Sequence, residues 1–206
     1  EFRLEGERIS QQLQNKLSSH SEAVNNIERL YASSENISRK DFSTFVINTI
    51  KNHKEIAALL WVPKIRHHQR SAFEANLINE GFPNFRLTEQ NLQKEIITAT
   101  QRDDYYPITF FSPFNANSPA FGYDMGSDTV QRNAIEDAIE SGLVTASDPL
   151  TLITGKAEQR SVLLIAPIYA HDKALGSIEQ RNEAIKGVTI SALVMSDLVE
   201  GLLSKE

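Results

Sequence analysis

The hydrophobic pattern of the chain changes at about residue 55. From Phe2 to about Tyr31, apolar residues recur at steps of three, four or seven, which is the spacing of one helix face. Beyond residue 55, six short runs are rich in β-branched and aromatic residues and are separated by turn formers or helix-like stretches. Most of these runs have no regular helix between them, which favours an antiparallel sheet. The sequence therefore predicts an α+β fold: a long N-terminal helix followed by an antiparallel sheet flanked by helices.

The predicted N-terminal helix carries a narrow apolar stripe. Its apolar positions are Ile9, Leu13, Leu17, Val24, Ile27 and Leu30. Such a stripe is too narrow to be buried all round and too long to be left bare. We therefore expect a helix of more than about thirty residues that packs against one partner, a second copy of the chain in a parallel homodimer. Because no capping residue precedes the pattern, we expect the helix to begin upstream of Glu1.

Capping residues predict the later helices. Ser38 or Asp41 begins a second helix, whose apolar side includes Phe42, Phe45, Val46, Ile50 and His53. Ser127 or Asp128 begins another helix, which Gly142 ends. A short helical connector is expected over 177–185, and a last amphipathic helix starts at 196.

Length and composition indicate one folded core with a helical appendage. The chain has 206 residues, of which 40% are hydrophobic and 23% charged, as in folded proteins. We divide it into a helical stalk over 1–55, a core over 56–195 and the start of an exit helix over 196–206. The longest apolar runs, such as Val162 to Ile168, are far shorter than the ~20 residues needed to span a bilayer. The sequence begins without methionine or a signal-peptide pattern, so we expect it to be part of a longer protein.

The residue types present argue against several functional classes. Lys and Arg total 21 against 27 Asp and Glu, and the net charge of −6 disfavours nucleic acid as a partner. Cysteine is absent, which excludes disulfides, thiolate zinc sites and cysteine nucleophiles. The sequence has no nucleophile elbow, phosphate-binding glycine loop, metal-ligand helix or kinase motif. We therefore predict no catalytic residue and no cofactor.

The histidines do not show the spacing of a metal site. His67 and His68 are neighbours that would point about 100° apart on a helix, whereas ligands on one helix face lie three or four residues apart. His20, His53 and His171 are isolated along the sequence. We therefore expect no metal, and we interpret His67 and His68 as solvated side chains at a strand-to-helix junction.

The segment 99–125 combines aromatic residues and prolines with an acid, Asp124. A loop this apolar is expected to close over something. We predict that the Asp124 carboxylate points into the space between sheet and loop, with Tyr106, Phe110 and Phe121 as apolar walls. Because a buried carboxylate needs a donor, the predicted ligand is a small nitrogen-bearing organic molecule.

Two structural alternatives stay open for these residues. In the first, Tyr106, Phe110 and Phe121 simply fill the core. In the second, Asp124 caps the helix at Ser127 or pairs with an arginine such as Arg102.

Short motifs in a fixed order resemble one family of sensory domains. They are W-x-P-x-I at Trp61–Ile65, R-x-x-F-E at Arg70–Glu74, AT-x-R at Ala99–Arg102, YYPI at Tyr105–Ile108, G-x-D at Gly122–Asp124, SDP at Ser147–Pro149, APIY at Ala166–Tyr169 and SDLVEGLL at Ser196–Leu203. From about Ile56 to Leu203 their order and spacing resemble the CHASE domain. That domain is the extracellular sensory module in front of histidine kinases, diguanylate cyclases and adenylyl cyclases, and it occurs in plant cytokinin receptors.

The resemblance implies a PAS-like antiparallel sheet on a long helix that continues into a transmembrane segment. It implies a ligand pocket in the sheet distal to the membrane, and a second, smaller PAS-like unit after the SDLVEGLL helix. It also implies that Asp124 hydrogen-bonds the ligand ring and that the strand at Thr145, Ala146 and Ser147 adds backbone contacts. The loop 112–124 departs from that of the plant receptors, which argues against cytokinin itself and leaves the ligand class open.

These observations predict the sensing domain of a membrane-anchored receptor, on the periplasmic or extracellular side. Ligand binding would shift the first and last helices relative to each other, and a cytoplasmic kinase or cyclase would respond to that shift. The alternative is a ligand-free sensory scaffold whose pocket is filled by its own aromatic residues and which acts through protein partners. A small enzyme is disfavoured because the catalytic motifs are missing.

Overall fold

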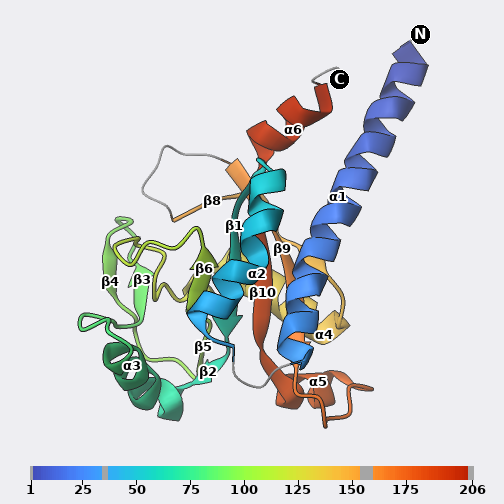
Figure 1. The fold of residues 1–206 in the computed structure, drawn as a ribbon. Coiled ribbons are helices and arrows are strands. Elements are labelled where there is room, and N and C mark those ends of the chain that lie inside the picture. Colours follow the sequence, from blue (N-terminus) through green and yellow to red (C-terminus); the bar gives the residue numbers. More distant parts are fainter. Residues whose placement is uncertain (1, 34–36, 154–159, 204–206) are drawn as a thin grey trace.

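The central strands of the chain form one antiparallel sheet. In the computed structural model, which describes residues 2–33, 37–153 and 160–203, the strand order is β6-β1-β10-β9-β7, and β8 also pairs with β9. These strands are β1 (Ile56–Pro63), β6 (Phe110–Ser112), β7 (Thr145–Ala146), β8 (Leu150–Thr151), β9 (Arg160–Tyr169) and β10 (Ile185–Val194). Their pairings are antiparallel, so the predicted α+β class is confirmed (Figure 1).

Helices and shorter strands surround this sheet. The helices are α1 (Phe2–Ser33), α2 (Arg39–Asn52), α3 (Arg70–Asn79), α4 (Thr129–Ser141), α5 (Ile178–Ala184) and α6 (Met195–Leu203), with 3-10 turns η1 (His67–Gln69) and η2 (Met125–Ser127). The short strands are β2 (Ile65–Arg66) with β5 (Asp104–Tyr105), and β3 (Thr88–Gln90) with β4 (Ile96–Thr98).

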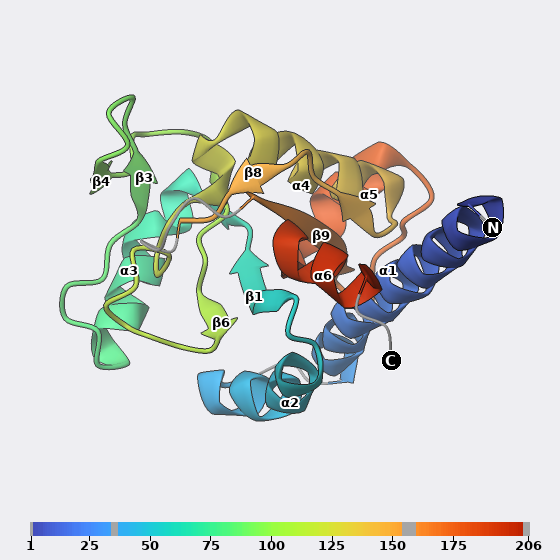
Figure 2. The ribbon, with the colours of Figure 1, turned by 90° about the horizontal axis from the view of Figure 1, so that it is seen from above.

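Alternation along β1 sends its side chains to opposite faces of the sheet. Leu59 and Trp61 pack in a cluster with α1 and α2, where the Tyr31 ring stacks on Trp61 at 4.2 Å. Leu60 and Val62 pack in a second cluster with α4. Figure 2 shows α2 on one side of β1 and α4 on the other. The sheet is therefore the middle layer of the domain.

The long helix α1 has 32 residues, which confirms the predicted length. Its second half packs on the sheet, where Val24 and Ile27 are buried. Its first half extends past the sheet (Figure 1), and there Leu17 is 37% exposed and Leu13 half-buried. The Ile9 side chain lies outside the described residues. The stripe thus packs on its own chain in one half and stays only partly covered in the other.

Capping contacts set the helix boundaries near the predicted positions. The backbone N–H of Asp41 donates to Ser38 Oγ, and the N–H of Ser38 donates to the Asp41 carboxylate, which forms a capping box. At the start of α4, the Asp128 carboxylate accepts the N–H of Gln131 at 2.9 Å. Gly142 follows α4 with φ 73°, the left-handed conformation that glycine adopts most readily.

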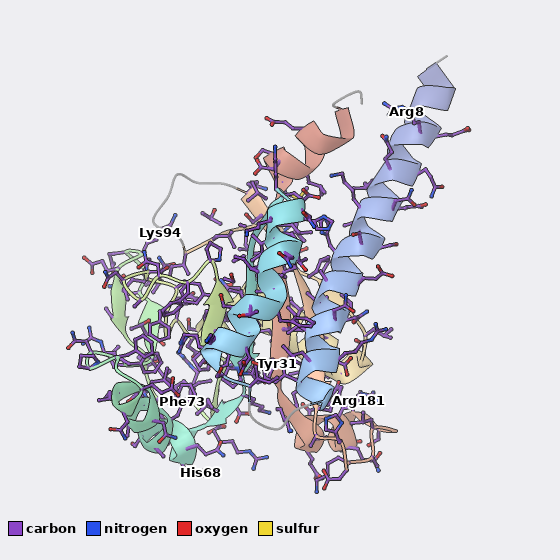
Figure 3. All side chains as sticks on the ribbon, in the orientation of Figure 1. Arg8, Tyr31, His68, Phe73, Lys94 and Arg181 are labelled. Atoms are coloured by element: carbon purple, nitrogen blue, oxygen red, sulfur yellow. The ribbon has the colours of Figure 1, made fainter. Side chains whose placement is uncertain are left out.

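A smaller hydrophobic cluster lies beyond the main sheet. Its buried members are Leu77, Phe85, Leu87, Ala99 and Tyr105. The sequence placed the Arg70–Glu74 helix on the first strand, but α3 packs on this cluster, through Leu77 and the partly buried Phe73 (Figure 3). Leu77 and Phe73 of α3 are therefore covered by this cluster and not by the main sheet.

Three predicted strands differ from those observed. The run 84–89 becomes β3 only at its end, where it pairs with β4, a strand that the sequence did not predict. The runs 105–111 and 143–153 each split into two short strands, interrupted near Pro107 and Pro149. Proline has no N–H to donate to a strand ladder, which explains the interruptions.

Candidate ligand site

A cavity of about 580 Å³ lies between the sheet and the loop that follows β6. Its lining includes Leu60 of β1 and Phe111 of β6, which belong to the cluster on the α4 face. The loop 113–120 and residues 152–153 complete the walls. Ligand pockets usually measure roughly 300–1,000 Å³ and are mainly apolar, so the cavity has the size of a small-molecule site.

Small side chains in the sheet create this space. Ala58 of β1 and Ala192 of β10 are direct cross-strand partners, and both line the cavity together with Ala57. A leucine or isoleucine pair at this position would fill the volume that the alanines leave open. The cavity therefore follows from the residue sizes at one register position of two strands.

A few polar groups stand around the apolar walls. Lys54 precedes β1, Asp197 lies in the first turn of α6, and Asn115, Asn117 and Ser118 come from the loop. The site thus offers one cation, one anion and neutral hydrogen-bonding groups beside an apolar body. This arrangement suits a small amphipathic molecule that carries both a donor and an acceptor end.

The cavity also touches the junction between the sheet and the last helix. Val194 is the final residue of β10, and Asp197 lies three positions further along in α6; both line the cavity. An occupant would therefore contact the sheet and α6 at once.

Asp124, the predicted ligand-binding acid, is fully buried away from this cavity. Its Oδ1 accepts the N–H groups of Tyr106 at 2.7 Å and Gly126 at 3.0 Å, and its Oδ2 accepts Arg102 Nη1 at 2.5 Å. Burial raises the pKa of the Asp124 carboxyl, while these donors favour its charged form and offset part of that effect. The carboxylate that sequence reasoning assigned to a ligand has donors from its own chain.

Glu89 shares the same arginine. Arg102 Nη2 donates to Glu89 Oε2 at 2.5 Å, and Thr100 Oγ1 donates to Glu89 Oε1 at 3.1 Å. Burial by itself raises the pKa of Glu89, but the hydrogen bonds from Arg102 and Thr100 outweigh burial and lower it. One guanidinium therefore holds two carboxylates, and the arginine pair proposed as an alternative for Asp124 is present. Asp124 caps the 3-10 turn η2, whereas the helix that follows Ser127 is capped by Asp128.

The aromatic residues predicted as walls lie elsewhere. Phe110 projects to the α1 and α2 face, where the Arg39 guanidinium lies 4.9 Å from its ring centroid. Strand alternation sends Phe110 to that face and Phe111 into the cavity, so the contact of Phe110 with a ligand stays a prediction. Tyr106 is buried in the core, and Phe121 packs among phenylalanine rings and lines a second surface hollow.

The strand that was predicted to make backbone contacts with a ligand, Thr145–Ser147, corresponds to β7 and the residue after it. Thr145 Oγ1 donates to the Ala134 carbonyl at 3.1 Å, and Ala146 is exposed. Ser147 Oγ accepts the N–H of Leu163 at 3.0 Å and so extends the pairing with β9. Among the described residues, none of these three lines the cavity, and their contact with a ligand stays a prediction.

The cavity residues that sequence reasoning missed include the alanines that leave the space open. Ala57, Ala58 and Ala192 lie in runs that were interpreted only as strands. Alanine is uncommon among strand formers, so its presence in the middle of two long apolar runs was the signal that could have found the site.

The observed fold is PAS-like, with an antiparallel sheet flanked by helices. Among solved structures it is similar to the ligand-binding domain of the amino acid chemoreceptor PctC of Pseudomonas aeruginosa, solved in complex with GABA. The TM-score is 0.55 over 96% of this chain and 64% of that chain, at 10% sequence identity. At this identity the likeness concerns the fold alone.

The family follows from the sequence. The family model of the CHASE domain matches residues 35–206, so the chain belongs to the CHASE domain family, as its motif order predicted. It is therefore a sensory domain.

Two curated relatives come from Dictyostelium discoideum. The germination-specific adenylate cyclase is 24% identical over 180 residues, which cover 86% of this chain and 20% of that protein. The hybrid signal transduction histidine kinase A is 24% identical over 164 residues, which cover 75% of this chain and 7% of that protein. The chain thus spans a small part of each relative. Within the described ranges, no helix has the length and apolar character to cross a bilayer.

Proposed function

We propose that this chain is the extracytoplasmic, non-catalytic sensing domain of a membrane-anchored receptor with a kinase or cyclase output. The support is its CHASE family membership and its relatives, one named as a cyclase and one as a histidine kinase. The observation that carries the proposal is the cavity at the β10–α6 junction, lined by Val194 and Asp197. A ligand there contacts the element that leaves the domain.

The cavity chemistry narrows the ligand class. Its body is apolar, and Asp197 and Lys54 provide one acceptor and one donor of opposite charge. A small nitrogen-bearing organic molecule with an acidic or carbonyl group at its other end would satisfy both. This proposal keeps the nitrogen-bearing ligand predicted from the sequence, but it moves the acceptor from Asp124, whose donors are internal, to Asp197. An open cavity also favours ligand sensing over a ligand-free scaffold.

Signal transmission would use α1 and α6. The two helices contact each other, and the start of α1 and the end of α6 lie on the same side of the domain (Figure 1). A ligand that binds more tightly to one pose of α6 shifts the population toward that pose. The change would then pass to segments of the receptor beyond both helices.

Filling the cavity tests the ligand site. The probes are GABA, the common amino acids and adenine, measured by calorimetry, together with native mass spectrometry of the purified chain. We expect Ala192→Leu to abolish binding of any probe or co-purified molecule, because leucine occupies the space between β1 and β10. Ala75→Leu is the matched control, since Ala75 is exposed in α3 and does not line the cavity. Equal loss in both variants, or binding retained in Ala192→Leu, would contradict the proposed site.

We also propose that intact receptors form homodimers through the first half of α1. Leu13 and Leu17 are only partly covered within one chain, as a helix stripe with a missing partner would be. Replacing both with Asp should weaken dimerisation in sedimentation experiments while the far-ultraviolet spectrum of the core stays unchanged. An unchanged oligomeric state in a form that dimerises would show that the stripe is not the interface.

A further inference from the structure

Two histidines that are far apart in sequence meet a glutamate where α1, α2 and β1 come together. His20 comes from α1, His53 caps the C-terminal end of α2, and Glu55 follows in the turn to β1. One ligand atom from each residue lies within 4.8 Å of the others. The sequence treated His20 and His53 as isolated, and the structure corrects this because α1 and α2 pack on the same face of the sheet. We propose that these three residues bind one divalent transition-metal ion such as Zn²⁺.

His20 is the strongest sign of a missing partner. Its side chain is fully buried, and neither ring nitrogen has a hydrogen-bond partner among the described residues. Nε2 lies 3.2 Å from Glu55 Oε1, but the two atoms do not have hydrogen-bond geometry. Buried polar groups in native proteins are nearly always satisfied, by protein, water or an ion. His20 Nε2 therefore lies beside a carboxylate oxygen without a hydrogen bond to it, at the separation expected of two ligand atoms on one metal ion.

The distances suit a zinc ion after a small adjustment. Zinc takes nitrogen and oxygen ligands at roughly 2.0–2.2 Å, which places tetrahedral ligand atoms roughly 3.3 Å apart. The His20 Nε2 to Glu55 Oε1 distance is 3.2 Å, and the His53 Nδ1 to Glu55 Oε1 distance is 3.6 Å. All the ligand atoms lie within 4.8 Å of one another, so the most widely separated pair would need to move closer by roughly 1.5 Å at most. Two imidazoles and one carboxylate form a ligand set that selects zinc and other late first-row transition metals over Mg²⁺ or Ca²⁺.

Lys16 is the group that a metal would have to displace. Its Nζ donates to Glu55 Oε1 at 3.2 Å, and its side chain is 30% exposed. A flexible lysine at this exposure can turn toward solvent when a divalent ion takes over Glu55. Removing the ammonium should therefore increase metal affinity, which a purely structural role for the cluster would not predict.

The position of Glu55 connects the cluster to the last helix. The Glu55 carbonyl accepts the N–H of Val194 at 2.9 Å, and α6 begins at the next residue, Met195. A metal held by His20 and Glu55 would fasten α1 to the point where the sheet passes into α6. The proposal goes beyond ligand sensing and does not depend on an occupant of the cavity.

The experiment measures Zn²⁺ binding to the tag-free, EDTA-treated chain by calorimetry and thermal unfolding. We expect one Zn²⁺ per chain and a higher melting temperature with Zn²⁺ but not with Mg²⁺. In His53→Ala and His20→Leu, the affinity should fall by more than the roughly 10–100-fold that loss of an outer-shell partner costs. Lys16→Met should bind more tightly than the parent.

The matched control is His171→Ala, because His171 is an exposed histidine outside the cluster. His68 serves the same purpose at the far end of the domain, beside α3 (Figure 3). Unchanged Zn²⁺ affinity in both cluster variants, equal loss in His171→Ala, or no binding to the parent and to Lys16→Met would overturn the proposal. Because His53 is partly exposed, His53→Ala should fold, so its result bears on the metal alone.

Discussion

Two buried carboxylates in this domain have opposite surroundings. Asp124 accepts two backbone N–H groups and one arginine, and all of these donors are held by the fold. Glu55 is also buried, yet its charged partner is the partly exposed Lys16, and the nearby His20 makes no hydrogen bond among the described residues. A carboxylate whose hydrogen bonds are all made by the fold holds loops together. A cluster with unsatisfied polar atoms can instead bind a partner from outside the chain, such as a metal ion.

The two clusters also lie in different parts of the domain. The Asp124 cluster joins Arg102, Tyr106 and Glu89, in the loops around β3, β5 and η2, away from both chain ends. The Glu55 cluster joins α1, α2 and β1, next to the start of α6. Figure 1 shows that α1 and α6 are the elements that carry the chain ends. The Glu55 cluster is therefore the one placed to act on the helices that leave the domain.

The largest effect is expected from Asp124→Ala. It leaves the Arg102 charge without one carboxylate and two backbone N–H groups without an acceptor, and breaking a buried pair in this way costs about 3–5 kcal/mol. At about 2–4 °C per kcal/mol for a chain of this size, the melting temperature should fall by about 10 °C. Thermal unfolding followed by circular dichroism measures it. The control is Asp128→Ala, which removes a helix cap and should cost only about 1 kcal/mol. An unchanged melting temperature together with lost ligand affinity would instead support the ligand role predicted from the sequence.

Local signals made much of the fold predictable. The helix that starts at Arg39 was predicted from Ser38 because a capping box depends on residues a few positions apart, and Gly142 marked the end of α4 for the same reason. The long strands β1, β9 and β10 were predicted because each is a run rich in apolar and β-branched residues, and each is largely buried in the fold.

The sites were harder to predict because they depend on contacts between distant residues. The Arg102–Asp124 pair was one of the open alternatives. The two residues are 22 positions apart, and nothing in the sequence near Asp124 shows whether its carboxylate is paired or free. The cavity depends on the register that sets Ala58 opposite Ala192, which is a property of the folded sheet. His20 and His53 meet only once α1 and α2 pack on the same face of the sheet. Spacing rules for metal ligands describe one element and cannot detect a site shared by three.

A smaller effect of opposite sign is expected from His20→Leu in the metal-free chain. A buried polar group without hydrogen bonds lowers the free energy of unfolding by about 1–3 kcal/mol, and replacing the His20 ring with leucine removes that cost. The melting temperature of the EDTA-treated variant should therefore rise by a few degrees, whereas Asp124→Ala lowers it. The comparison is sharpest when both are measured in the same buffer. A fall in His20→Leu of the size expected for Asp124→Ala would mean that His20 is already satisfied and that the two clusters do not differ as described.

The smallest expected effect is a pH dependence of stability that distinguishes Glu89 from Asp124, the two carboxylates that are bonded to Arg102. The pKa of Glu89 is lowered below its ordinary value of 4.5 in the fold, so its ionised form adds stability that is present above pH 4.5 and is lost as pH falls through the folded pKa. The pKa of Asp124 is raised by burial, so its titration acts in the opposite sense and cannot produce this loss.

Glu89→Gln keeps an acceptor for Arg102 but removes the charge, at a cost of about 1 kcal/mol near neutral pH. Melting temperatures measured from about pH 6 down to about pH 3.5 should converge for parent and variant, because protonation makes the parent resemble the variant. Parallel curves over that window would show that Glu89 carries no pH-dependent stability, and that the arginine is held by Asp124 alone.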